Sequence, residues 1–335
     1  MTSLLDPARP TGHSTLRTAW RTWHRPLLIC AALMSALMLL SGIGMAVDSR
    51  TLLGESVWAK PLKFAFAFTL YTATLAWLLT KLNKGRRLAR WTGTVFALAA
   101  TAEVAAITLQ AARGTFSHFN ADQSDPITLA LVPVLTLGVM VIVIAQLLIS
   151  TVVLIQRTGG RDLNRALRAG LALATAGMLI PIYWMAGATH PRTVTDANGT
   201  DIPMYQGHGI GDPDGHGMPL TNWSTTGGDF RVPHFFALHG IQALLLLTVA
   251  LIALSTRHPR LRDERVRARL IGTAALGYSG LVAVVTWQAA RGQSLIHPDT
   301  ATLTAFAAVL LLTAAITIQV IRAGRLTPSR RESST

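Results

Sequence analysis

A short polar motif, Gln-Ala-Ala-Arg-Gly, occurs twice in the chain, at 110–114 and again at 288–292. The glutamine and the arginine of each copy are three residues apart, so they share one face of a helix. A histidine follows each copy, His118 in the first and His297 in the second. Because an arginine guanidinium offers a fork of donors suited to carboxylate or phosphate, the motif indicates recognition of an anion.

Other polar residues are expected at the same end of the helices as this motif. Glu103 lies seven residues before Gln110 on the same helix face, about 10 Å deeper along the helix. Ionisable groups inside apolar segments usually face a protein interior or a wet cavity. We therefore expect an outward-facing, cationic polar cavity. Its candidate ligand-binding residues are Lys60, Lys63, Glu103, Gln110, Arg113, His118, Asp229, Arg231, His234, His239, Gln242, Gln288, Arg291 and His297.

Each of these residue types also has a structural interpretation. Lysines at the ends of apolar segments can extend to the lipid headgroups. The two glutamines of the repeated motif can form hydrogen bonds between helices, and Glu103 can form a structural ion pair. His234 and His239 are five residues apart, so a regular helix points them in different directions. These two histidines are therefore not expected to bind one metal ion together.

Three functions remain as alternatives. The first is binding or transport of an anionic small molecule or lipid headgroup by the cavity. The second is a membrane redox protein that binds haem b, with His234 or His239 paired with His118 or His297 as axial ligands. The third is a membrane enzyme acting on a lipid substrate, in which a histidine is the general base and an arginine holds phosphate. The sequence does not identify catalytic residues for the third alternative.

The composition is typical of a membrane protein. The chain has 335 residues, of which 50% are hydrophobic and 14% charged, and its apolar residues form blocks of about twenty, the length that crosses a hydrocarbon core. The net charge of +14 comes from Lys and Arg between those blocks, which indicates membrane orientation rather than nucleic-acid binding. The single cysteine, Cys30, excludes an internal disulfide.

These blocks predict an all-α polytopic membrane protein that is embedded in a lipid bilayer. A secretory signal ending near Gly44-Met45-Ala46 is the alternative for the first block, which is too long for a usual signal core. The eight expected transmembrane helices are 26–47, 61–80, 91–111, 127–155, 166–188, 233–254, 270–290 and 301–321.

Every second loop is strongly basic, which predicts the orientation. Positive residues accumulate after the second, fourth and sixth helices and at both ends of the chain. Cytoplasmic loops carry this excess, so both termini are expected in the cytoplasm.

The two copies of the motif extend into an internal duplication. Eight of the twelve residues from 103 to 114 are identical to those from 281 to 292. Since four helices separate the copies, they predict a parallel 4+4 repeat related by an axis along the membrane normal. The expected parts are a basic tail at 1–25, a first repeat at 26–156, a second at 166–322 and a tail at 323–335.

The second repeat contains one long outer loop, 189–232, whose Gly, Pro, Asp and Asn content predicts an irregular lid. Met204, His208, His216 and Met218 are ligand types that suit a soft metal such as copper. Their spacing matches no defined metal site.

Three motifs resemble an uncharacterised family of bacterial multi-pass membrane proteins. They are Trp-x-Lys-Pro-x-Lys-Phe at 58–64, Gln-x-x-Arg-Gly-x-x-Ser-His-Phe-Asn at 110–120, and Gly-Asp-x-Arg-x-x-His-Phe-x-x-Leu-His-x-x-Gln at 228–242. The resemblance covers the second to the seventh helix. It implies the cytoplasmic membrane of a bacterium and no particular activity.

Overall fold

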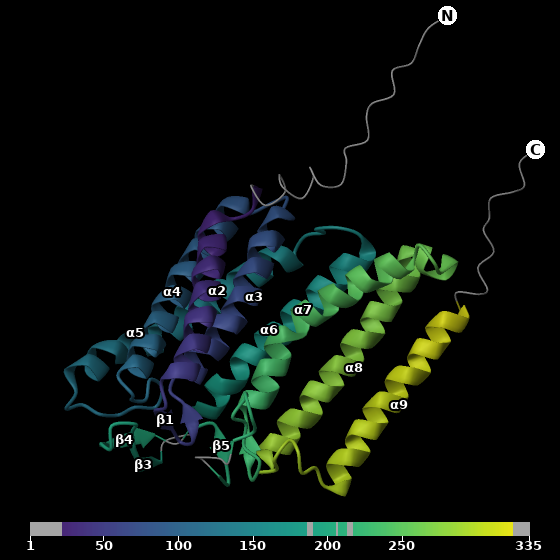
Figure 1. The fold of residues 1–335 in the computed structure, drawn as a ribbon. Helices are drawn as coiled ribbons and strands as arrows, with labels where there is room; N and C mark the ends of the chain where they lie inside the picture. Colours follow the sequence, from purple (N-terminus) through teal and green to yellow (C-terminus); the bar gives the residue numbers. More distant parts are fainter. Residues whose placement is uncertain (1–21, 186–189, 206, 213–216, 324–335) are drawn as a thin grey trace, which may run out of the picture.

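The computed structural model describes residues 22–185, 190–205, 207–212 and 217–323. In this part of the chain, eight helices are long and apolar enough to cross a membrane (Figure 1). The expected tails lie outside the described residues, apart from 22–25 and 323. The helices are α2 (Arg25–Val47), α3 (Ala59–Thr80), α4 (Arg86–Ala112), α5 (Pro126–Leu154), α6 (Arg161–Met185), α7 (Arg231–Leu254), α8 (Glu264–Ala290) and α9 (Thr300–Ala323).

The eight predicted helices are confirmed, with one systematic difference in their starts. Helices α4, α6 and α8 begin five or six residues before the predicted apolar segments, in the basic loops. Arginine and glutamate favour helix almost as much as alanine does. Each helix therefore continues beyond its apolar part.

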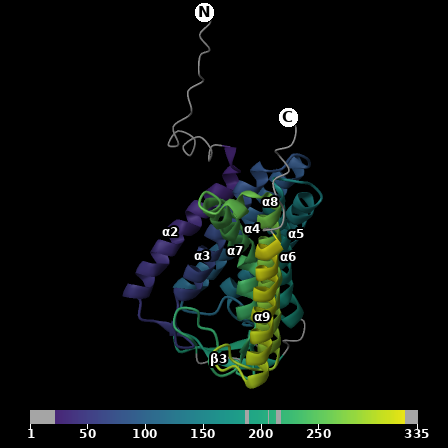
Figure 2. The same ribbon diagram turned by 90° about the vertical axis from the view of Figure 1, so that its right-hand side faces the viewer.

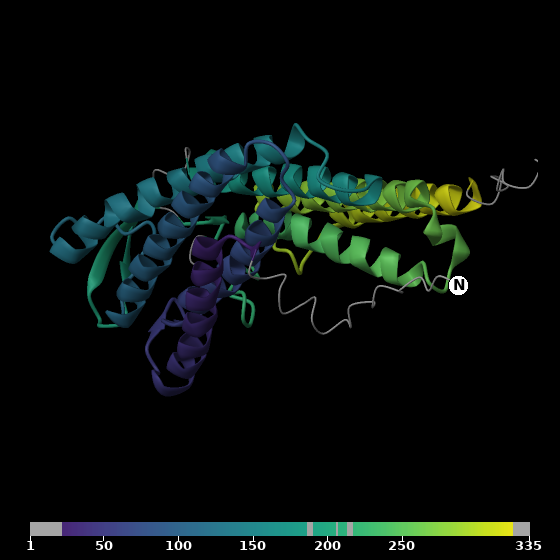
Figure 3. The ribbon, with the colours of Figure 1, turned by 90° about the horizontal axis from the view of Figure 1, so that it is seen from above.

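The helices run up and down between two ends of the bundle, and α2 begins at the end where α9 finishes (Figure 1). Viewed from above, α2 to α5 lie on one side and α6 to α9 on the other (Figure 3). Within the first group α2 packs on α3 and α4, α3 on α4, and α4 on α5. The second group has the corresponding contacts: α6 with α7 and α8, α7 with α8, and α8 with α9.

The main apolar core fills the first group and extends into the second. Phe96 of α4 and Leu75 of α3 are fully buried in it, and Leu171 of α6 and Ile241 of α7 join the same cluster. A second cluster lies between α6, α7 and α8. The two groups are therefore held together by apolar packing of α6 and α7 against the first group.

Two glycines allow α6 and α7 to approach closely. A Cβ atom at Gly170 would lie 2.6 Å from the Cα atom of Ile241, and one at Gly177 would lie 2.7 Å from the backbone nitrogen of Leu238. Small residues at helix interfaces of membrane proteins permit this backbone approach. The contact at Gly177 also brings α7 close enough for His234 Nδ1 to donate to the Gly177 carbonyl, at 2.6 Å.

Helix α9 stands at the right-hand edge of the bundle in Figure 1 and in front of the other helices in Figure 2. Its main packing partner among the described helices is α8, and of residues 300–323 only Thr302 is buried. Large apolar side chains on the outside of the bundle, such as Leu39 of α2 and Leu311 of α9, are about 70% exposed (69% and 71%). An aqueous protein rarely exposes such a continuous apolar surface, whereas lipid tails accommodate it.

The long loop between α6 and α7 is more regular than the sequence predicted. Strands β3 (Pro191–Thr195) and β4 (Asp201–Tyr205) form an antiparallel hairpin, and β5 (Gly209–Ile210) pairs with β6 (Gly228–Asp229). A further short pair, β1 (Thr51–Leu52) and β2 (Glu55–Ser56), joins α2 to α3. The prediction of an irregular loop was wrong for these strands, because alternating buried residues, Val194 opposite Ile202, give the hairpin a small apolar core with Met204 and Phe116.

The close approach of α6 and α7 gives a stability prediction. Replacing Gly170 with alanine forces the new Cβ atom against backbone, so we expect a loss of about 1–3 kcal/mol. The matched control is Gly42→Ala in α2, where the nearest atom to a new Cβ is 3.9 Å away and alanine favours the helix. Denaturant titration of both variants in detergent measures the difference; equal stability of the two variants would contradict the packing described here.

Candidate functional site

The predicted site residues gather at one end of the bundle, where α2, α4, α6 and α8 finish and the other four helices begin. We call this the lid end, and we call the described residues of 190–230 the lid (190–205, 207–212 and 217–230). The strands of the lid lie across this end in Figure 1. The basic loops after α3, α5 and α7 are at the opposite end.

The repeated motif ends α4 and α8 in the same way. Gly114 and Gly292 have φ angles of 73° and 71°, in the left-handed region that glycine adopts without strain. The next residue donates its N–H to the carbonyl of the motif glutamine, at 3.0 Å in the first copy and 3.1 Å in the second. This pair of turns is the Schellman arrangement, which satisfies the last carbonyls of a helix.

The glutamines of the motif bind the loops that follow. Gln110 donates to the carbonyl of Phe116 (3.3 Å) and to the hydroxyl of Thr128 (2.8 Å). Gln288 donates to the carbonyl of Ser294 at 2.7 Å. Both side chains are 1% exposed, so these bonds replace the hydration that a buried amide loses.

The arginines of the motif bind the aspartates that begin the following helices. Arg113 lies 2.8 Å from Asp125, which also caps α5, and Arg291 pairs with Asp299 before α9. These arginines and the cap N–H groups hold the pKa of both aspartates well below the usual range. Each copy of the motif therefore joins the end of one helix to the start of the next.

The lid binds the loop that follows the first copy of the motif. Asn198 Nδ2 donates to the carbonyl of Arg113 at 2.9 Å, and the Ala197 N–H donates to the carbonyl of Gly114 at 3.0 Å. The Tyr205 N–H donates to the carbonyl of Phe119 at 2.9 Å. The β3–β4 hairpin is thereby fixed to the first group of helices.

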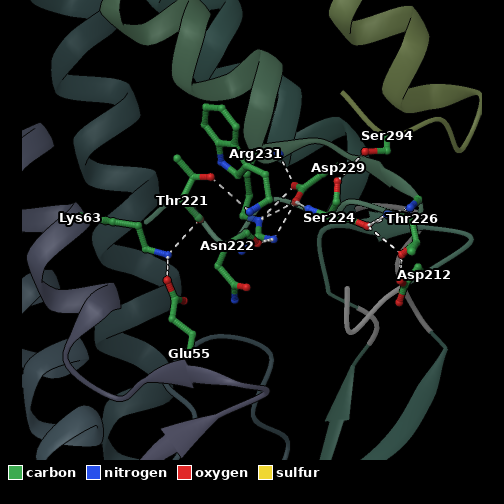
Figure 4. Close-up of polar contacts among 12 residues, drawn as sticks. Glu55, Lys63, Asp212, Thr221, Asn222, Ser224, Thr226, Asp229, Arg231 and Ser294 are labelled. Atoms are coloured by element: carbon green, nitrogen blue, oxygen red, sulfur yellow. Dashed lines mark hydrogen bonds and ion pairs between the residues drawn. The ribbon is translucent and has the colours of Figure 1, made fainter. Parts of the chain in front are cut away.

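The other half of the lid binds the second group of helices (Figure 4). Asp229, only 3% exposed, accepts from Arg231 Nε at 3.0 Å and from the Ser224 N–H at 3.0 Å. Ser294, after α8, donates to the carbonyl of Ser224 at 2.8 Å. Arg231 also donates to the Asn222 carbonyl. Arg231 is therefore used to hold the lid at the start of α7.

Lys63 connects this part of the lid to α3. Its ammonium donates to Glu55 at 2.6 Å and to the carbonyl of Thr221 at 3.1 Å (Figure 4). Lys63, in α3, therefore connects β2 to the lid.

Lys60, one turn before Lys63, differs from the other cations at the lid end. Within the described residues its ammonium has no ion pair or hydrogen bond, although the side chain is half-buried. It lies within electrostatic range of Lys63 and Arg231 as well as of Glu103 and Glu55. An ammonium at such a place lacks full compensation for its lost hydration.

Glu103 and His118 lie below the lid and form a polar pair. The Glu103 carboxylate is 1% exposed, and its Oε1 atom is 3.2 Å from His118 Nε2. The His118 ring packs beside Phe64 of α3, with ring centroids 5.9 Å apart. Burial, followed by the charge of Lys60, lowers the pKa of His118 well below its usual range. A neutral imidazole therefore faces the buried carboxyl group.

His208 of the lid and His234 of α7 complete this polar cluster. Burial lowers the pKa of His208 well below its usual range, with smaller contributions from Arg231, Lys60, His118 and His234. His208 also packs edge-on against Phe119. We call Lys60, Glu103, His118, His208 and His234 the central cluster. It combines groups from both halves of the bundle and from the lid.

The remaining candidates lie away from the central cluster. His239 is one turn deeper in α7, beside Phe235, with an unpartnered Nε2 atom. Gln242 donates to Thr74 of α3 at 3.3 Å. His297 is exposed and bonds to the carbonyl of Thr225 through Nδ1, at 2.9 Å.

The sequence missed two parts of this arrangement. His208 was considered only as a soft-metal ligand; of its proposed companions, Met204 is buried in the lid core and His216 lies outside the described residues. No group of three His, Cys, Asp or Glu side chains suited to a metal occurs in the described part of the chain. The partners Asp125 and Asp299 were also missed, although both stand three residues before a buried threonine at a helix start.

The arginine–aspartate pairs predict an acid-dependent stability. Folding lowers the pKa of each aspartate. The stabilisation that each ion pair adds to the free energy of unfolding is therefore complete above the ordinary aspartate pKa of about 4, and it is lost as the pH falls further. We expect the Asp125→Asn/Asp299→Asn protein to be less stable at pH 7, with about 1 kcal/mol from the partly buried Asp125 pair.

Melting curves of the purified protein between pH 7 and about pH 3 measure this effect. The wild-type protein should lose more stability on acidification than the double variant does. Asp201→Asn, an exposed lid change, is the matched control and should follow the wild-type curve. Parallel acid curves for wild type and double variant would contradict the pairing.

No protein-family model matches the chain, and no curated protein or solved structure matches it.

Proposed function

We propose that this chain is a multi-pass protein of a bacterial cytoplasmic membrane that binds an anionic small molecule or lipid headgroup at the central cluster. The eight apolar helices support insertion into a bilayer. The resemblance of the three motifs to bacterial membrane proteins supports the bacterial membrane. The basic loops after α3, α5 and α7 support a cytoplasmic position of both termini and an outward-facing lid.

The architecture in this proposal is a parallel 4+4 repeat. The matching order of helix contacts in α2–α5 and α6–α9 supports it. Further support comes from the two copies of the motif, which have the same helix cap, the same glutamine bond to a carbonyl six residues later, and the same arginine–aspartate pair. In this arrangement the central cluster lies where the two repeats meet.

Lys60 is the observation that carries the proposed ligand class. Arg113, Arg231 and Arg291 are each paired with an aspartate, so their charges are compensated within the protein. The ammonium of Lys60 has no such partner among the described residues. An anion bound beside Lys60 would compensate this charge.

The histidines supply the polar contacts that give such a site its specificity. His234 uses Nδ1 to donate to Gly177, which leaves Nε2 for a ligand. His118 and His208 approach Lys60 from the end of α4 and from the lid. A ligand held by all three histidines is enclosed by the lid, so the lid must move for the ligand to enter.

Transport is the extended form of the proposal, and Glu103 is its candidate coupling residue. A carboxyl group that is 1% exposed and lies beside a histidine can bind and release a proton as its surroundings change. Entry of an anion next to Lys60 would favour protonation of the Glu103–His118 pair, because like charges repel. Anion and proton would then be carried together.

The binding proposal predicts that the Lys60→Gln protein loses affinity for the ligand. Purified protein is mixed with a panel of small carboxylates and phosphates, and ligand-induced thermal stabilisation is measured. Removing the ammonium should weaken binding of the best ligand by about tenfold to a hundredfold, the effect of one charged hydrogen bond.

Lys81→Gln is the matched control, because Lys81 lies at the opposite end of α3 against Trp77. It should bind as wild type does. Unchanged binding by the Lys60 variant would refute the proposed site. A stoichiometric haem absorbance spectrum of the purified protein would instead support the haem alternative.

The transport proposal predicts that Glu103→Gln separates binding from coupling. Vesicles containing this variant should bind the ligand but show no uptake driven by a pH gradient, because the amide does not exchange a proton. Uptake of the radiolabelled ligand against an imposed gradient measures this. Retained pH-driven uptake in the Glu103 variant would exclude Glu103 as the coupling group.

A further inference from the structure

A polar hollow lies at the end of the bundle opposite the lid. It has a volume of about 130 Å³ and lies between the start of α2, the end of α3 and the start of α4, which meet at the same end in Figure 1. Its lining residues are Thr22, His24, Leu79, Thr80, Arg86 and Arg90. None of these belongs to the central cluster.

His24 is buried in the wall of this hollow with one nitrogen unused. The residue is 6% exposed, and its Nδ1 atom has no hydrogen-bond partner. Its Nε2 atom is 3.4 Å from the Thr94 hydroxyl. Since that hydroxyl donates its proton to the Arg90 carbonyl at 3.0 Å, it can only accept from His24. The neutral ring therefore carries its proton on Nε2, and a second proton would place a donor on Nδ1.

Positive charge surrounds the hollow. Arg86 and Arg90 are exposed, and within the described residues neither guanidinium has an ion pair or hydrogen bond. Helices α2 and α4 both begin here, without a capping side chain and without an acidic residue in the first turn. Helix starts carry partial positive charge and unsatisfied N–H groups, which favour an anion.

We propose that this hollow binds a phosphate-like oxyanion between Arg86, Arg90 and His24. The guanidinium groups supply forked donors for the oxyanion oxygens. The chemistry fits the headgroup phosphate of an anionic lipid and also fits a free phosphate or sulfate ion. The site is independent of the function proposed for the lid end.

The unused nitrogen makes this binding dependent on pH. Burial and the charge of Arg90 lower the pKa of His24, so the ring is neutral when the site is empty. Arg86 and Arg90 are the charged groups that line the hollow from α4, Arg25 is next to His24 in α2, and α3 contributes only Leu79 and Thr80. A bound anion attracts a proton to Nδ1, so binding should tighten as the pH falls.

The test compares Arg86→Gln/Arg90→Gln with a double substitution at the same end of the protein. The control is Arg87→Gln/Arg157→Gln, which removes equal charge from the same end of the protein without changing a lining residue. Binding of inorganic sulfate and of phosphate to detergent-purified full-length protein is measured by calorimetry. Binding of lipid is measured by mass spectrometry after purification from nanodiscs containing phosphatidylglycerol or only phosphatidylcholine.

We expect the Arg86/Arg90 variant to lose at least about tenfold in affinity for one of these probes, and the control to keep wild-type affinity. Sulfate binding that tightens from pH 8 to pH 6 in wild type but not in His24→Gln would identify the histidine as a ligand. Retained phosphatidylglycerol without binding of free anions would identify a lipid site, and the reverse would identify a soluble-anion site.

Two results would overturn the proposal. One is the absence of binding of sulfate, phosphate and phosphatidylglycerol to the wild-type protein. The other is an equal loss of affinity in the Arg86/Arg90 variant and in the control, which would mean that only the overall charge of this end attracts anions.

Discussion

A charged side chain between apolar helices is stable only where another charge, a hydrogen bond or a ligand replaces its lost hydration. The lid end satisfies this requirement for nearly all of its cations. Arg113 and Arg291 bind the aspartates that start the next helices, and Arg231 binds Asp229. Lys63 binds Glu55. Lys60 is the exception among these residues, and it lies beside the neutral histidines of the central cluster.

The same polar contacts determine how the two groups of helices meet. The lid is bound to the loop after α4 through Asn198 and to the region after α8 through Ser224. Apolar packing of α6 and α7, made possible by Gly170 and Gly177, continues the main core below it. The central cluster is therefore enclosed by elements that are far apart in sequence but fixed to one another.

The sequence predicted the helices well because their signal is local. Blocks of about twenty apolar residues suffice to identify transmembrane helices. The helix starts differ from the predicted ones by more than two residues only where charged helix formers continue a helix into a basic loop, as at Arg86. The repeated motif was found as a pattern, but the partners of its arginines were not predicted. Asp125 and Asp299 stand twelve and eight residues after those arginines, and this difference in loop length obscures their equivalence.

The central cluster was predicted only in part, because its members come from separate segments. Lys60, Glu103, His118 and His234 were candidates from the sequence, whereas the hairpin that brings His208 to them depends on pairing within the lid. The hollow around His24 was not predicted at all. Its residues are ordinary basic-loop residues in the sequence, and only the packing of α2 against α4 brings them together.

Histidine footprinting tests the central claim most directly. Full-length protein is treated with diethyl pyrocarbonate, with and without small carboxylates and phosphates, and each histidine is quantified by mass spectrometry. Bound anion at the central cluster should protect His118 and His208 together, while the exposed His190 and His258 remain equally reactive. Unchanged reactivity of His118 and His208 with an anion that demonstrably binds would place the ligand elsewhere and contradict the proposed site.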